Sequence, residues 1–109
     1  MMNIPDGRPD LRKFQRILLP EGRAIQCHGT EPKFDAVISV IGLGGMFIRY
    51  PHIGPLGTRL RVQVEDTAVT FRAECTVRDV ADTGVGVEFT KLASEDERKL
   101  KDLLHRLRP

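Results

Sequence analysis

The sequence predicts a mainly β protein, with about six short antiparallel strands forming a sandwich or a small barrel and one α-helix after them. From residue 21 onward, apolar and polar residues alternate with a period of two, which is typical of strands that have one face on a core and one in water. Near the C-terminus the apolar spacing changes to that of a helix. The chain has 109 residues, enough for one domain with a single modest core.

The first three strands are expected near Arg23–His28, at residues 34–40 and at residues 45–50. The glycine-bearing turn "GLGG" joins the second of these to the third, and the loop "PHIGPLG" follows. Because so many short strands would otherwise leave bare edges, the sheet must close or be covered.

The alternation is clearest in residues 67–80. The inward positions there are Val69, Phe71, Ala73, Cys75 and Val77. Residues 58–66 and 84–89 show the same pattern, and the short break at Asp66 and Thr67 predicts a hairpin between the first two of these three strands. One apolar and one polar face on each strand favours an antiparallel sheet.

Residues 94–107 predict a helix that packs on the sheet. Ser94 and Glu97 have the spacing of a capping box, and acidic residues gather in the first turn, as the helix dipole prefers. One apolar stripe runs along it, formed by Leu100, Leu103, Leu104 and Leu107. A coiled-coil seam needs several heptads, and this helix has barely two, so intramolecular packing or a modest dimer contact is favoured.

Composition favours a cytoplasmic protein. The 17 Lys and Arg against 15 Asp and Glu leave a net charge of +2, too mild for a protein wrapped in nucleic acid. No apolar run approaches the roughly 18 residues of a membrane span, and the N-terminus lacks the apolar middle of a signal peptide. Cys27 and Cys75 are predicted to be buried small hydrophobes, with a disulfide or metal site as the alternative.

The sequence carries no recognisable catalytic motif, so we do not expect an enzyme. It lacks a nucleophile elbow, an HExxH helix and a phosphate-cradling loop. The glycines of "GLGG" join two strands with no helix after them, so they form no dinucleotide fingerprint. No cofactor is expected, and no metal either, because His28, His52 and His105 are scattered along the chain.

The stretch "RKFQR" is the strongest candidate for a binding segment. Arg12 and Arg16 lie four apart with Lys13 between them. A guanidinium can fork onto phosphate oxygens or onto a guanine edge, so two of them suit a guanine nucleotide. The spacing is common, since Arg8 and Arg12 repeat it, and plain solvated charges remain the alternative.

The whole layout resembles the PilZ domain, a bacterial receptor module for cyclic di-GMP. "RKFQR" resembles the family's RxxxR motif, "LGGMFIRYPHIGPLGTRLRVQV" its glycine turn, strand, loop and strand, and "DTGVGVEFTKL" its closing segment. The resemblance covers Arg12 to Leu107. It implies a six-stranded antiparallel barrel with a C-terminal helix, comprising residues 21–109, after a flexible arginine-bearing segment at residues 1–20.

The resemblance also implies the ligand-binding residues: Arg12, Lys13, Arg16, Gly42 and Gly45. In the family's second motif, [DN]xSxxG, Gly45 matches the glycine, but Val40 and Gly42 replace the polar residues. A second register uses Ser39 and Gly42 and puts Val37 at the acidic position, which we disfavour because the following strand and loop then fall out of step. Two lost hydrogen bonds predict an affinity weaker by about one to three orders of magnitude.

Four charged residues are candidates to replace the missing polar groups, although ordinary surface charges are the favoured interpretation of each. They are Arg49, Arg78, Asp35 and Asp79.

Three functions compete. The first is a cyclic di-GMP receptor with weakened or lost affinity, and the second is a PilZ-like adaptor of the type IV pilus or motility kind that acts through an unidentified protein partner. The third, a barrel that binds single-stranded nucleic acid, is disfavoured because Phe14, Phe47 and Tyr50 are the only aromatic residues that could stack on bases. We therefore expect neither DNA nor RNA as a partner, and a monomer or weak dimer.

Overall fold

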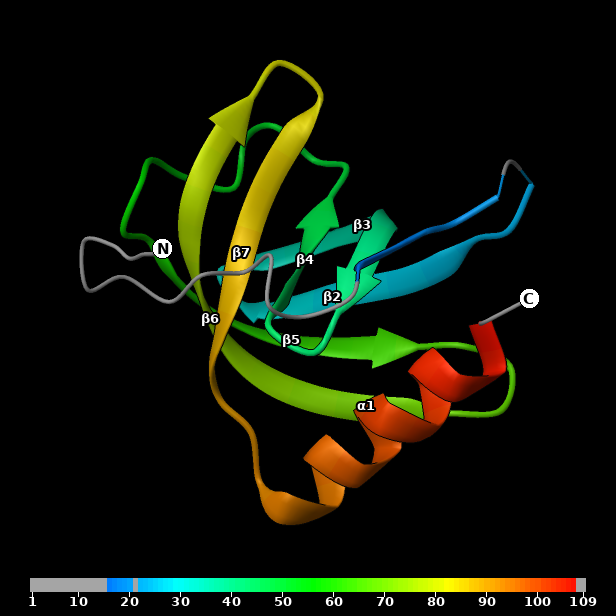
Figure 1. The fold of residues 1–109 in the computed structure, drawn as a ribbon. Helices are drawn as coiled ribbons and strands as arrows, with labels where there is room; N and C mark the ends of the chain where they lie inside the picture. Colours follow the sequence, from blue (N-terminus) through cyan, green and yellow to red (C-terminus); the bar gives the residue numbers. More distant parts are fainter. Residues whose placement is uncertain (1–15, 21, 108–109) are drawn as a thin grey trace, which may run out of the picture.

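The computed structural model describes residues 16–20 and 22–107, and it confirms a closed six-stranded antiparallel barrel with a C-terminal helix (Figure 1). A seventh strand is added to one edge of a barrel strand. The elements, in chain order, are β1 (Arg16–Leu18), β2 (Ile25–Glu31), β3 (Lys33–Gly42), β4 (Gly45–Ile48), β5 (Arg59–Glu65), β6 (Thr70–Ala81), β7 (Gly84–Lys91) and α1 (Ser94–Leu107). The strand order is β1-β3-β2-β5-β6-β7-β4, and the pairing of β4 with β3 closes the barrel.

β3 makes this closure possible because it is long enough to serve three neighbours. Its first half pairs with β2, and its second half pairs with β4 on the opposite edge. Beyond the end of β2, the last three residues of β3 pair with β1. A register shift between Ile38 and Val40 marks a bulge at Ser39, which turns the strand from one set of neighbours to the next.

β1 was not predicted from the sequence. Residues 1–20 were expected to form a flexible segment, and within it Arg16–Leu18 form a short strand in the antiparallel ladder with β3. Alternation is difficult to detect over three residues, and a short edge strand depends on its partner for its hydrogen bonds. Residues 1–15 lie outside the described part of the chain.

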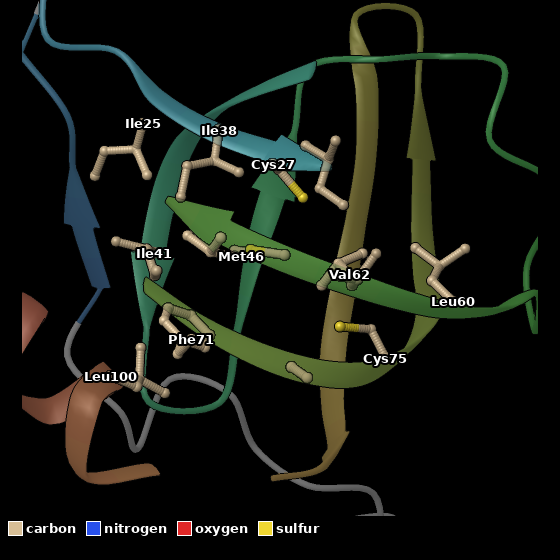
Figure 2. Close-up of a cluster of buried hydrophobic side chains, with 14 of the residues drawn as sticks. Ile25, Cys27, Ile38, Ile41, Met46, Leu60, Val62, Phe71, Cys75 and Leu100 are labelled. Carbon is tan, nitrogen blue, oxygen red and sulfur yellow. The ribbon is translucent and has the colours of Figure 1, made fainter. Parts of the chain in front are cut away.

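The core fills the barrel with the inward side chains that the alternation predicted. Figure 2 shows side chains from several strands, among them Ile25, Cys27 and Phe71, pointing into one cluster. All five inward positions predicted in residues 67–80 are buried; four lie on β6, and Val69 directly precedes it. Phe89 of β7 is half-buried and packs its ring edge-to-face on Phe71, with 6.0 Å between the ring centroids.

Both cysteines are free and buried in this core. Burial raises the pKa of the Cys27 thiol to about 12. Burial also raises the pKa of Cys75, and the nearby Cys27 and Glu74 add to the effect. Both groups therefore stay protonated at neutral pH and act as small apolar side chains, as predicted.

Helix α1 covers one end of the barrel beside β6 (Figure 1). Its leucine stripe faces the core as predicted, with Leu100, Leu103 and Leu104 buried and Leu107 half-buried. The carbonyl of Ala93 accepts a hydrogen bond from the amide of Glu97, so the first helical bond begins one residue before the predicted cap at Ser94. Asp96 accepts a hydrogen bond from the backbone amide of Arg72 at 3.0 Å, which ties the helix start to β6.

Candidate functional site

The register of β1 brings the end of the arginine motif to the second-motif positions. Arg16 lies directly opposite Gly42, and Leu18 lies directly opposite Val40. Directly opposed residues of an antiparallel pair project to the same face, and Arg16 is exposed, so this face is the outside of the barrel. Arg12 and Lys13, the other two predicted binding residues in this motif, lie outside the described residues.

Gly42 and Gly45 flank the turn between β3 and β4, and Gly45 has a structural reason to be glycine. It lies opposite Glu88 of β7. A Cβ atom at Gly45 would overlap the backbone carbonyl oxygen of Val87, which belongs to the neighbouring strand and cannot move aside as a flexible side chain would. This glycine therefore lets β4 approach β7 closely, whether or not a ligand binds.

Two residues further along β1 from Arg16, the outer face is apolar. Leu18 of β1, Val40 of β3 and Phe47 of β4 are successive cross-strand neighbours, and Gly86 of β7 lies opposite Phe47. The Leu18 side chain is 74% exposed, while Val40 and Phe47 are half-buried. The second-motif positions 40 and 42 thus supply no side-chain hydrogen-bonding group to this face.

The four candidate replacement residues lie in different places. Asp35, on the first half of β3, is engaged by His28 of β2. Arg49 follows the end of β4, where its backbone amide bonds to Val37. Arg78 and Asp79 of β6 are the two that lie near the turn: Asp79 is opposite Gly86, and Arg78 reaches Glu88.

Glu88 was not among the site residues predicted from the sequence. The Arg78 Nε atom donates a hydrogen bond to Glu88 Oε1 at 2.8 Å, and the Glu88 side chain is only 13% exposed. The alternation in "GVGVEF" indicates that position 88 faces outward. Its location beside Gly45 follows only from the β4–β7 register.

His28 forms a second polar cluster, on the outer face of β2, β3 and β5. Its Nδ1 lies 2.6 Å from Asp35 Oδ1 and its Nε2 lies 3.3 Å from Glu65 Oε1. The hydrogen bond to Asp35 is the main cause that raises the pKa of His28 above its ordinary 6.5; desolvation opposes the shift, and the charge of Glu65 adds to it. Two carboxylate neighbours require both ring nitrogens to donate, so the imidazolium form fits this cluster.

A pH dependence of stability follows from this cluster. A raised folded-state pKa means that the stabilisation is complete below the ordinary pKa of 6.5 and is lost as pH rises through the folded value. We expect the melting temperature to fall between about pH 6 and about pH 8, and to fall less in His28→Gln. The effect is small because the cluster is exposed. Equal pH profiles for the two proteins, measured by thermal denaturation, would contradict it.

A hollow of about 500 Å³ lies elsewhere, over β2, β5, β6, the end of β7 and the start of α1. Its polar lining includes Arg61, Arg72, Glu74, Lys91 and Asp96. None of the described predicted site residues lines it. The charges alternate in sign across three neighbouring strands, because Arg61 is opposite Glu74 and Glu74 is opposite Lys91. The positive and negative side chains of the hollow therefore largely offset each other.

Residues 16–20 and 22–107 contain no group of three or more His, Cys, Asp or Glu side chains placed to hold a metal ion. Within the same ranges, no helix has the length and apolar character needed to cross a membrane.

The family model of the PilZ domain matches residues 10–106. Solved structures with a similar fold include YcgR from Escherichia coli in complex with c-di-GMP, with a TM-score of 0.71 and 19% identity over 88% of this chain and 45% of that one. The PilZ domain of YcgR from Escherichia coli with c-di-GMP has a TM-score of 0.71 and 16% identity, over 90% of this chain and 92% of that one. The Bacillus subtilis inhibitor of motility MotI/DgrA has a TM-score of 0.66 and 17% identity, over 91% of this chain and 52% of that one.

The chain therefore spans about half the length of the first YcgR chain and of MotI/DgrA, and most of the separate PilZ domain of YcgR. At these identities the likeness establishes the fold. Comparison with curated proteins gave no match.

Proposed function

The chain belongs to the PilZ domain family, and from this premise we propose that it is a bacterial signalling receptor that binds cyclic di-GMP with weakened affinity. The register of Arg16 opposite Gly42 is the observation that carries the proposal. It joins the arginine motif to the turn between β3 and β4, so a ligand on this face can be reached from both. The two YcgR structures, which contain c-di-GMP, support the same ligand.

The arginines supply most of the binding in this proposal. Arg16 is exposed beside a glycine, so its guanidinium can take a phosphate or the O6 and N7 edge of a guanine in a bidentate manner. We propose the same role for Arg12, with Lys13 adding positive charge. Because Val40 and Gly42 offer no polar groups, the affinity is lower than that of a domain with a complete second motif.

A protein adaptor that does not bind the nucleotide is the second candidate. The observation that favours it is the apolar outer row of Leu18, Val40 and Phe47, which suits a protein contact better than the polar edge of a base. In either role we propose a cytoplasmic, non-enzymatic domain, monomeric or weakly dimeric, that passes a signal to a protein partner. Regulation of motility is the process that the likeness to MotI/DgrA favours.

Calorimetric titration with cyclic di-GMP tests the proposal. We expect measurable binding by the wild type and loss of about tenfold or more in Arg16→Ala, because a charge-assisted bond to the ligand contributes about 1.5–3 kcal/mol. Arg61→Ala is the matched control, since this exposed arginine lies on β5 in the separate hollow. A flat trace for the wild type at about 1 mM ligand would reject the receptor and leave the adaptor.

A further inference from the structure

One row of residues crosses the outer face from β1 to β7 and passes over both glycines of the turn. Arg16 is opposite Gly42, Gly42 and Gly45 flank the turn, and Gly45 is opposite Glu88. Neighbouring strands lie about 4.8 Å apart, so the backbones of Arg16 and Glu88 are separated by three such steps, or about 14 Å. Between these two charged side chains, the row contains no side chain at all.

The far end of this row is an anchored carboxylate. Glu88 is held by Arg78 through its Oε1 atom, and among the described residues no second hydrogen bond to the carboxylate is formed. A carboxylate has about four acceptor positions, so Oε2 retains acceptor capacity for a ligand. The low exposure of Glu88 makes such a bond stronger than it would be in open solvent.

The Glu88 carboxylate supplies the hydrogen-bond acceptor that positions 40 and 42 lack. The edge of guanine carries two adjacent donors, the ring N1–H and the exocyclic N2 amine, and a carboxylate is an acceptor for both. Adenine presents an acceptor at N1 and has no amine at C2, so the same carboxylate discriminates against it. The side chains of Val40 and Gly42 can neither accept these hydrogen bonds nor discriminate between the two bases.

We propose that Glu88, oriented by Arg78, accepts hydrogen bonds from a guanine edge of the nucleotide and so replaces the missing carboxylate or amide of the second motif. Arg16, at the other end of the row, takes a phosphate or the opposite edge of the base. The purine plane then lies over the backbone of Gly42 and Gly45, with Phe47 beside it. This inference rests on the proposed function, because it assigns the guanine-reading group for the same ligand.

The arrangement has an electrostatic logic. A carboxylate alone beside a dianionic ligand would repel it, but the Arg78–Glu88 pair is neutral overall and still presents an acceptor. The Arg78 side chain is 52% exposed, so its remaining N–H groups can also reach a phosphate. The Arg78–Glu88 pair thus accepts hydrogen bonds from the base without adding net negative charge to the outer face of the barrel.

The test is a calorimetric titration of the full chain with cyclic di-GMP and with cyclic di-AMP. We expect Glu88→Gln to bind cyclic di-GMP about tenfold or more weakly than the wild type, with a smaller preference for guanine over adenine. Glu74→Gln is the matched control, because Glu74 also pairs with an arginine across neighbouring strands but lies in the separate hollow. Adding Val40→Asp to Glu88→Gln should restore the guanine preference.

A measurement on the wild type alone keeps the inference testable should Glu88→Gln fail to fold. Cyclic di-IMP lacks the N2 amine, so the wild type should bind it about tenfold more weakly than cyclic di-GMP. Equal affinities for these two ligands, or a Glu88→Gln protein that behaves like Glu74→Gln, would overturn the role of Glu88 and leave the receptor function standing. No binding of cyclic di-GMP by the wild type at about 1 mM would overturn both.

Discussion

Replacing Val40 by aspartate and Gly42 by serine in one protein should raise the affinity for cyclic di-GMP by about one to three orders of magnitude. Each new polar group returns about 0.5–3 kcal/mol of hydrogen bonding, and about 1.4 kcal/mol corresponds to a factor of ten. Both positions lie on the outer face, one beside Leu18 and one beside Arg16. Gly42 does not have a positive φ, so serine introduces no backbone strain there.

Val37→Asp is the control that separates the two motif registers. Val37 is on the same strand and opposite Gln26 of β2, away from β1. It is also the acidic position of the disfavoured register, in which Ser39 and Gly42 are already present. A gain in Val37→Asp without a gain in the double variant, measured by calorimetry, would show that the disfavoured register is the correct one.

Leu100→Ala should lower the free energy of unfolding by about 2–5 kcal/mol. The Leu100 side chain is 0% exposed and is the first leucine of the helix stripe to enter the core (Figure 2). Truncating it removes buried apolar surface and leaves a cavity where α1 meets the barrel. Domains of this size are stable by about 5–15 kcal/mol, so the change removes a large part of the total.

Urea denaturation followed by circular dichroism measures this effect. Leu56→Ala is the matched control, since Leu56 is 66% exposed in the loop between β4 and β5, and its loss should change stability by less than about 0.5 kcal/mol. Similar unfolding midpoints for the two variants would mean that α1 does not contribute to the core as its packing indicates.

Local patterns account for most of the correct predictions. The hairpin at Asp66 and Thr67 is confirmed by the pairing of Glu65 with Thr70 and by the hydrogen bond from the Asp66 amide to the Val69 carbonyl. The helix spans residues 94–107 as predicted, because the spacing of its apolar residues and its charged ends depend only on residues close together in the sequence. The first strand, expected near Arg23–His28, is β2 at Ile25–Glu31. Boundaries are less well predicted because hydrogen bonds to other strands decide them.

The candidate site was only half predictable. Arg16, Gly42 and Gly45 were identified through a motif resemblance, and the roles assigned to Arg12 and Lys13 remain predictions on residues outside the described part. The proposed role of Glu88 could not be predicted because it depends on neighbours that are distant in sequence: Glu88 is 43 positions from Gly45 along the chain and directly opposite it in the sheet. Arg78 and Asp79 were candidates among four, and the β6–β7 pairing placed them near the turn.

By itself, the amino-acid sequence determined the type of each long element, the side chains that face the core and the absence of polar groups at positions 40 and 42. Each of these depends on a local period of two or 3.6 residues or on residue identity alone. Tertiary structure decided that β1 joins β3, that Arg16 meets Gly42, and that Glu88 lies across the turn from Arg16. Cross-strand neighbours are set by register, and register follows from how the closed barrel buries all its inward faces at once.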